Sequence, residues 1–165
     1  MDRPSGKRLN AASPVPILCA ALGAAVGSTV AELLLWWFAG EDAMQNLFRD
    51  ARLTAAIVMG QRLFAQPADF DPLVMGVATI VHLSLSLAYT IVLAKAIRNM
   101  SLRSALLAGS AFGLVLYGVN LHVFTAIFPW FIPVRGVITL VAHLVFGITA
   151  ATMYHVARRQ LRSRH

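Results

Sequence analysis

Residues 15–39 read VPILCAALGAAVGSTVAELLLWWFA, and this stretch decides the fold class because it is long, apolar and almost free of charge. Its only charged residue is Glu32. A helix that crosses roughly 30 Å of hydrocarbon needs about 20 apolar residues, and this stretch is long enough. Three further stretches have the same character, at residues 72–96, 102–128 and 134–156. The sequence therefore predicts an all-α integral membrane protein, a bundle of four transmembrane helices.

The composition supports this class. Of the 165 residues, 58% are hydrophobic and 13% are charged, whereas soluble domains have about 45–50% and about 25%. This excludes a disordered chain, a nucleic-acid-binding module and most soluble enzymes, and it makes the lipid bilayer the expected partner. The lone cysteine, Cys19, excludes an intramolecular disulfide and any Cys-rich metal site, and we expect it to be a buried structural thiol. The first span is too long for a cleavable signal peptide.

The basic residues predict the orientation, because Lys and Arg gather in cytoplasmic loops. Most of them lie in the two tails, residues 1–14 and 158–165, and near the connection between the second and third spans. We therefore expect both termini in the cytoplasm, with one membrane domain at residues 15–157 between two basic tails. An alternative use of the basic residues is to hold anionic lipid. The residues concerned are Arg3, Lys7, Arg8, Lys95, Arg98, Arg103, Arg158, Arg159, Arg162 and Arg164.

The long outer connection between the first two spans, residues 40–71, contains a further helical pattern. Its apolar residues recur at helical spacing, which predicts an amphipathic helix in the outer interface that ends at Gly60, followed by a turn at residues 66–69. This helix either anchors the hairpin or forms a lid over the bundle. Aromatic residues at the outer ends of spans predict an interfacial belt. The helix has Met44, Leu47, Phe48, Ala51, Ala55 and Val58, and the belt has Trp36, Trp37, Trp130 and Phe131.

Two glycine pairs are spaced four residues apart, Gly23 with Gly27 and Gly109 with Gly113. Small residues at this spacing let helix backbones approach closely, so the pairs predict tight contacts within the bundle or between two copies of the chain. In addition, residues 76–83 (GVATIVHL) resemble residues 136–144 (GVITLVAHL). Such a repeat fits a duplicated hairpin, although apolar segments also match by chance.

Five polar residues are predicted to lie within the outer half of the bilayer, where ionisable groups are costly and usually face the protein interior. On the second span, a polar stripe follows helical spacing through Thr79, Ser86 and Tyr89, and a comparable stripe of polar and small residues runs along the fourth span. The sequence therefore predicts one intramembrane polar cluster. Its members are Glu32, His82, Asn120, His122 and His143.

Three interpretations of the polar cluster remain open. His82 and His143 could be axial ligands of a b-type haem, with Gly147 leaving room for the ring. Alternatively, Glu32 and the histidines could bind a metal, relay protons or hold a solute. In the third interpretation, the polar groups only hydrogen-bond to one another and fix the helix register. No phosphate loop, dinucleotide fingerprint, nucleophile elbow or intramembrane pair of carboxylates is present, so we expect no enzymatic activity.

The chain resembles a group of small, uncharacterised bacterial inner-membrane proteins, some of which carry a sodium:proline symporter label. The resemblance rests on FRDARLTAAIVMG at residues 48–60, TIVH at 79–82 and YGVNLHVF at 117–124, followed by FPW at 128–130, and it extends over residues 15–157. It implies a location in the bacterial inner membrane and carries over no functional residue. From the sequence we expect a non-enzymatic accessory or interaction subunit that packs against itself or a larger membrane complex. The alternatives are a haem-binding or metal-binding redox subunit and a small solute or proton carrier.

Overall fold

The computed structural model describes residues 14–65 and 67–163, and within these residues the regular structure is entirely helical. Four helical segments are long and apolar enough to cross a membrane, which confirms the prediction of four such helices. These segments are Val15–Phe38, Pro72–Ile97, Leu102–Ala126 and Val137–Leu161. The helices are α1 (Val15–Phe38), α2 (Ala43–Met59), α3 (Pro72–Ile97), α4 (Leu102–Gly118) and α5 (Val137–Arg162).

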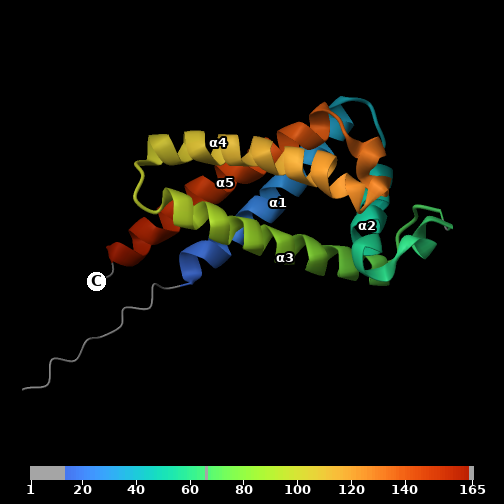
Figure 1. Ribbon diagram of the computed structural model, residues 1–165, viewed down its shortest axis with the longest axis horizontal. Helices are drawn as coiled ribbons and strands as arrows, with labels where there is room; N and C mark the ends of the chain where they lie inside the picture. Colours follow the sequence, from blue (N-terminus) through green and yellow to red (C-terminus); the bar gives the residue numbers. More distant parts are fainter. Residues whose placement is uncertain (1–13, 66, 164–165) are drawn as a thin grey trace, which may run out of the picture.

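The four long helices run lengthwise beside one another, and α2 crosses one end of the bundle (Figure 1). Helix α5 packs against both α1 and α4, whereas α3 packs mainly against α1 and α2 and makes few contacts with α4. We call the end crossed by α2 the α2 end. The opposite end, which holds Lys95, Arg98, Arg103, Arg158 and Arg159, is the basic end.

Local sequence signals set the ends of α2 and the start of α3. The Asp42 carboxylate accepts hydrogen bonds from two backbone N–H groups in the first turn of α2, and Asp71 does the same for α3. Such carboxylates satisfy donors that have no partner within the helix. Helix α2 ends at Met59 because Gly60 adopts a φ of 81°, a conformation that disfavours other residues. The predicted helix and its break at Gly60 are thus present; Gln66, in the predicted turn, lies outside the described residues.

Small residues allow α4 and α5 to meet backbone against backbone. A Cβ atom added to Gly109 or Gly147 would collide with the backbone of the other glycine, and one added to Gly113 would collide with the backbone of His143. Gly23 and Gly27 also face α5, but they pack against the side chains of Met153 and Thr149. Both glycine pairs therefore lie at helix contacts within one chain.

The half of the bundle toward the basic end is filled by a continuous core. Its residues are small or aliphatic, with two aromatic rings at the edge, and most are almost completely buried. A smaller core lies beneath α2, where Ala51, Ala55 and Ala56 pack on Val74 and Ala78 of α3. The main core consists of Ala20, Ala24, Leu93, Ala94, Ile97, Ala105, Leu116, Phe146, Ala150, Ala151 and Tyr154.

The third predicted span, residues 102–128, is not one continuous α-helix. After α4, Val119–Val123 form a π-helical turn, Phe124–Ala126 a 3₁₀ turn and Pro129–Val134 a second 3₁₀ segment. Pro129 cannot continue an α-helix. The Arg135 guanidinium stabilises the altered end, since it donates to the Leu121 carbonyl at 2.6 Å and to the Thr125 hydroxyl at 2.7 Å.

The boundaries of the fourth predicted span also differ from the structure. Helix α5 begins at Val137, three residues later than residue 134, because the preceding segment is the 3₁₀ turn. At the other end, α5 continues through Arg162, so most of the segment predicted as a tail is helical. Residues 1–13 of the predicted N-terminal tail lie outside the described residues, as do residues 164 and 165.

Two predictions about single side chains are wrong. Cys19 is exposed on the surface of α1 rather than buried, because it lies on the side of the helix away from the core. Trp36 is only 4% exposed and does not belong to a lipid-facing belt. The Arg49 guanidinium of α2 lies over its ring, 5.9 Å from the centroid. Its neighbour Trp37 is 66% exposed, as a belt residue would be.

Candidate functional site

A cavity of about 290 Å³ lies in the half of the bundle toward the α2 end. It exists because α3 diverges from α4 there, while α2 and the 3₁₀ segment after α4 close the end (Figure 1). Most of its wall is apolar and includes four phenylalanines, Phe124, Phe128, Phe131 and Phe146. Its polar lining residues are Ser28, Glu32, Asp50, Thr54, His82, Ser86, Tyr89, Asn120, Thr139 and His143.

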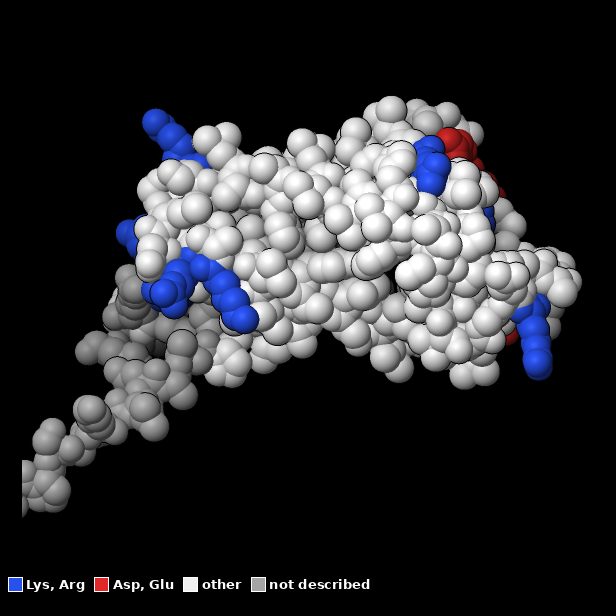
Figure 2. All heavy atoms as spheres, in the orientation of Figure 1, with Lys and Arg blue, Asp and Glu red and all other residues white. Residues whose placement is uncertain are grey.

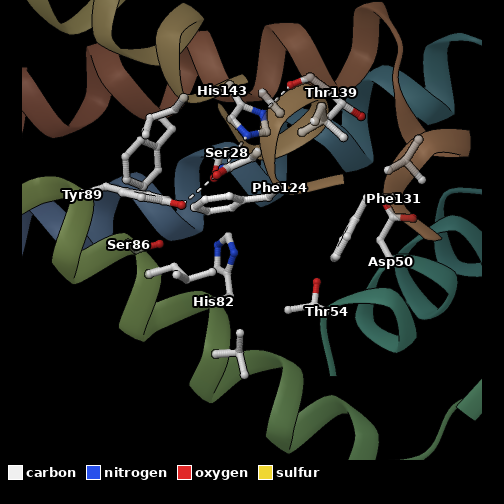
Figure 3. Close-up of a pocket in the computed structure, with 18 of the residues that line it drawn as sticks. Ser28, Asp50, Thr54, His82, Ser86, Tyr89, Phe124, Phe131, Thr139 and His143 are labelled. Atoms are coloured by element: carbon white, nitrogen blue, oxygen red, sulfur yellow. Dashed lines mark hydrogen bonds between the residues drawn. The ribbon is translucent and has the colours of Figure 1, made fainter. Parts of the chain in front are cut away.

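A chain of hydrogen bonds runs along one side of the cavity and links three helical segments (Figure 3). The Tyr89 hydroxyl of α3 donates to Asn120 Oδ1 at 2.7 Å. Asn120 Nδ2 lies 3.2 Å from His143 Nε2, and His143 Nδ1 lies 2.8 Å from the Thr139 carbonyl. Because a carbonyl oxygen only accepts, Nδ1 must carry the proton, and Nε2 therefore accepts from Asn120. The Tyr89 hydroxyl, the Asn120 amide and both ring nitrogens of His143 therefore each have a hydrogen-bond partner.

Asn120 reaches this position because it lies in the π-helical turn Val119–Val123. A π-turn places one extra residue in the helix and rotates the residues that follow, and such turns occur often at functional sites. Asn120 is thus directed toward Tyr89 and His143, whereas His122 is exposed and lies edge-on to the Tyr117 ring, with centroids 5.6 Å apart. The cavity includes four of the five predicted polar residues, and His122 is outside it.

His82 differs from His143 in its hydrogen bonding. Its Nε2 atom is buried and has no hydrogen-bond partner, although the side chain lines the cavity. In Figure 3 the ring extends from α3 into the space between the helices, on the side opposite His143. Buried polar atoms are nearly always paired, so His82 is a residue of the cavity lining whose hydrogen bonding the described part of the chain leaves incomplete.

Carboxyl groups from two helices line the part of the cavity near α2. Glu32 comes from α1 and Asp50 from α2, and both are partly buried. Asp50 also accepts a hydrogen bond from Arg49 Nε at 2.7 Å, the one ion pair in the part of the chain that the structure describes. Burial raises the pKa of the Asp50 carboxyl, and the Arg49 guanidinium opposes this shift.

Several cavity residues were not predicted from the sequence. Asp50 and Thr54 lie on α2, where the amphipathic pattern was defined by the apolar residues alone. Ser28 lies on the first span one turn before Glu32, and its spacing of four from Glu32 is a signal that could have identified it. Phe131, expected in the aromatic belt, lines the cavity instead.

The residues do not fit the haem interpretation. Both ring nitrogens of His143 are engaged, so Nε2 has no free lone pair for an iron atom. Gly147 does not provide room for a porphyrin, because the backbone of Gly109 lies directly against it. The described residues also contain no group of three His, Cys, Asp or Glu side chains placed to hold a metal ion.

Comparison of the chain with protein-family models, with curated proteins and with solved structures gave no match.

Proposed function

We propose that this chain is a non-enzymatic, multi-pass protein of the bacterial inner membrane that binds a small amphipathic molecule in the cavity at the α2 end. The observation that carries this proposal is a mostly apolar cavity lined by His82, a residue whose buried Nε2 has no hydrogen-bond partner in the described part of the chain. Ligand sites in proteins combine apolar walls with a few convergent polar groups in this way.

The cavity favours a particular kind of ligand. Its volume of about 290 Å³ suits a small molecule, since drug-sized ligands occupy roughly 300–1,000 Å³. Apolar walls would hold the body of the ligand, while His82 Nε2 and the carboxyl groups of Glu32 and Asp50 offer hydrogen bonds to a polar group. A molecule with an apolar body and one hydrogen-bonding end satisfies both requirements.

The arrangement of the helices supports entry from the side. Helix α3 and the end of α4 make few contacts, and Figure 2 shows a narrow hollow on this face of the molecule, between the two segments. Because the surrounding surface is apolar, this opening would face lipid, and the ligand would enter from the membrane. The filled core toward the basic end favours binding over an open path through the bundle.

We place the basic end in the cytoplasm, with both termini on that side. Lys95, Arg98 and Arg103 lie at this end together with the arginines of α5, whereas acidic residues gather at the α2 end (Figure 2). In this orientation α2 lies near the outer interface. A membrane-impermeant maleimide should label a cysteine introduced at Glu41 in intact cells but not one at Met100, in a Cys19→Ser background. The reverse labelling pattern would invert the orientation.

We prefer ligand binding to the interaction-subunit hypothesis because four of the five residues of the polar cluster line a cavity rather than an external surface. Wild type, His82→Leu and Thr79→Val proteins should be purified in lipid nanodiscs, and their small molecules extracted and identified by mass spectrometry. Thr79 is exposed on the same helix and serves as the matched control. We expect a molecule of defined mass with wild type and Thr79→Val that is lost from His82→Leu.

A structural role for the cavity predicts the opposite result. Replacing an unpartnered buried nitrogen with a leucine side chain should then stabilise the protein, because burying an unsatisfied polar group is costly. If His82→Leu is more stable than wild type and no bound molecule is lost, the ligand-binding proposal is wrong.

A further inference from the structure

A second hollow lies at the basic end, between the connection that follows α3 and the last turns of α5. Its volume is about 370 Å³. Three arginines border it, two from α5 and one from the connection. The lining residues are Arg98, Asn99, Met100, His155, Arg158 and Arg159.

Arg158 is held in place at this hollow by two contacts. One of its Nη atoms donates a hydrogen bond to the Arg98 carbonyl, and its guanidinium lies 5.9 Å from the centroid of the Tyr154 ring. The hydrogen bond connects α5 to the end of α3, whereas the ring contact lies within α5. Arg158 therefore has a structural role, and its position brings the neighbouring Arg159 and Arg98 to the same hollow.

No carboxylate neutralises these cations within the described residues. The ion pair in this part of the chain is the one between Arg49 and Asp50 at the opposite end. Figure 2 shows blue side chains at the basic end, and the visible red ones lie at the α2 end. The C-terminal ends of α3 and α5 carry partial negative charge, which favours nearby cations. The hydrogen bond from Arg158 to the Arg98 carbonyl, at the end of α3, is a contact of this kind. Within the described residues the side chains of Arg98 and Arg159 donate no hydrogen bond, so their N–H groups are available to a ligand.

We propose that this hollow binds a phosphate group, from either an anionic phospholipid headgroup or a soluble phosphate compound. The planar guanidinium presents paired N–H donors that match phosphate oxygens, so several arginines around one hollow suit this group. Basic pockets between the cytoplasmic ends of membrane helices bind anionic headgroups in this manner. The inference is independent of the ligand proposed for the cavity at the α2 end.

The test compares two double variants that lose the same charge. Arg98→Gln with Arg159→Gln removes two cations from the hollow and leaves Arg158 and its helix contacts intact. Lys95→Gln with Arg103→Gln removes two exposed cations that do not line it. Each protein is purified in detergent, mixed with phosphatidylglycerol or phosphatidylcholine, and examined by native mass spectrometry. In a parallel experiment, inorganic phosphate is titrated while the thermal unfolding of lipid-free protein is followed.

We expect the Arg98/Arg159 variant to bind phosphatidylglycerol about 10-fold to 30-fold more weakly than wild type. The Lys95/Arg103 variant should stay within about threefold, and phosphatidylcholine should bind weakly to all three proteins. If inorganic phosphate instead raises the thermal stability of wild type but not of the Arg98/Arg159 variant, the site exists and its ligand is a soluble phosphate.

Two results would overturn the inference. If the two double variants lose the same amount of affinity for phosphatidylglycerol, the basic end attracts anions only through its overall charge. Equal binding of phosphatidylglycerol by wild type and the Arg98/Arg159 variant, with no stabilisation by phosphate, would show that the hollow binds neither. Circular dichroism of each variant checks that the helices are retained.

Discussion

Helices α4 and α5 meet in two different ways along their length. Toward the basic end, Gly109 and Gly147 bring the two backbones into contact. Toward the α2 end, the π-turn that follows α4 is joined to α5 through the side chains of Asn120 and His143, and Tyr89 of α3 completes the chain of hydrogen bonds. The close backbone contact extends as far as Gly113 against His143. Beyond it the two segments are joined by side chains, and this second region borders the cavity.

Helix α3 divides the molecule in the same way. Its last turns contribute Leu93, Ala94 and Ile97 to the main core, whereas its middle carries His82, Ser86 and Tyr89 along the cavity. The basic half is therefore stabilised by close apolar packing, and the α2 half by separate polar contacts. Substitutions in the two halves should therefore change the free energy of unfolding by different amounts.

The largest effect is expected at the contact between α4 and α5. Gly147→Ala should lower the free energy of unfolding by about 2–3 kcal/mol, because the added methyl group collides with the backbone of Gly109 and must force the helices apart. Unfolding in a titration with SDS, followed by circular dichroism, measures this change.

Gly118→Ala is the matched control, since a Cβ atom there would meet nothing within 4 Å. It should be neutral or stabilise the protein by up to about 1 kcal/mol, because alanine favours the helix over glycine. Equal destabilisation by the two variants would show that backbone contact does not hold the basic half together.

The polar chain of the α2 half should give a smaller effect. Asn120→Ala removes two hydrogen bonds and leaves Tyr89 and His143 without their partner, so we expect a loss of about 1–2 kcal/mol. Tyr89→Phe removes one of these bonds and should cost about 0.6 kcal/mol. The same unfolding titration compares them, and an Asn120→Ala loss as large as that of Gly147→Ala would remove the proposed difference between the halves.

Helix α2 is fastened to the rest of the α2 end by few polar contacts. Trp130 Nε1 donates to the Leu53 carbonyl at 3.0 Å, so Trp130→Phe should cost about 1 kcal/mol and loosen α2 locally. Hydrogen exchange should become faster in α2 and remain unchanged in the basic half of α5. Trp37→Phe, at an exposed position, is the control. Faster exchange throughout the chain would show that the two halves unfold as one unit.

The smallest expected effect is a pH dependence at Asp50. Burial raises the pKa of its carboxyl, so the folded chain holds a proton at pH values where the unfolded chain has lost it. The free energy of unfolding should therefore fall as the pH rises from the ordinary aspartate pKa of about 4 to the raised value. Asp50→Asn should remove this part of the pH dependence.

Arg49→Gln should act in the opposite direction. The Arg49 guanidinium lowers the pKa of Asp50, so its removal should raise that pKa further and extend the fall in stability to higher pH. Unfolding titrations over a series of pH values test both variants. Identical pH profiles for wild type and Asp50→Asn would exclude Asp50 as the source.

Much of the fold was predictable from local signals. Four apolar stretches predicted four long helices, and the pattern of Met44 to Val58 predicted α2 with its end at Gly60. The π-turn at Asn120 was not predictable, because its geometry depends on Arg135, which contacts it from beyond the second 3₁₀ segment. The sequence grouped His122 with Asn120 by predicted depth, but residues two apart on a helix do not face each other.

The sequence alone determined the four long helices and α2, because hydrophobic length and residue spacing along one helix are local properties. It also selected Glu32, His82 and His143 as residues of interest. Only the tertiary structure decided that His143 is fully paired while His82 is not, and that Asp50 joins Glu32 at one cavity. These properties depend on how closely α2, α3, α4 and α5 approach, and that distance follows from side-chain packing between segments far apart in the chain.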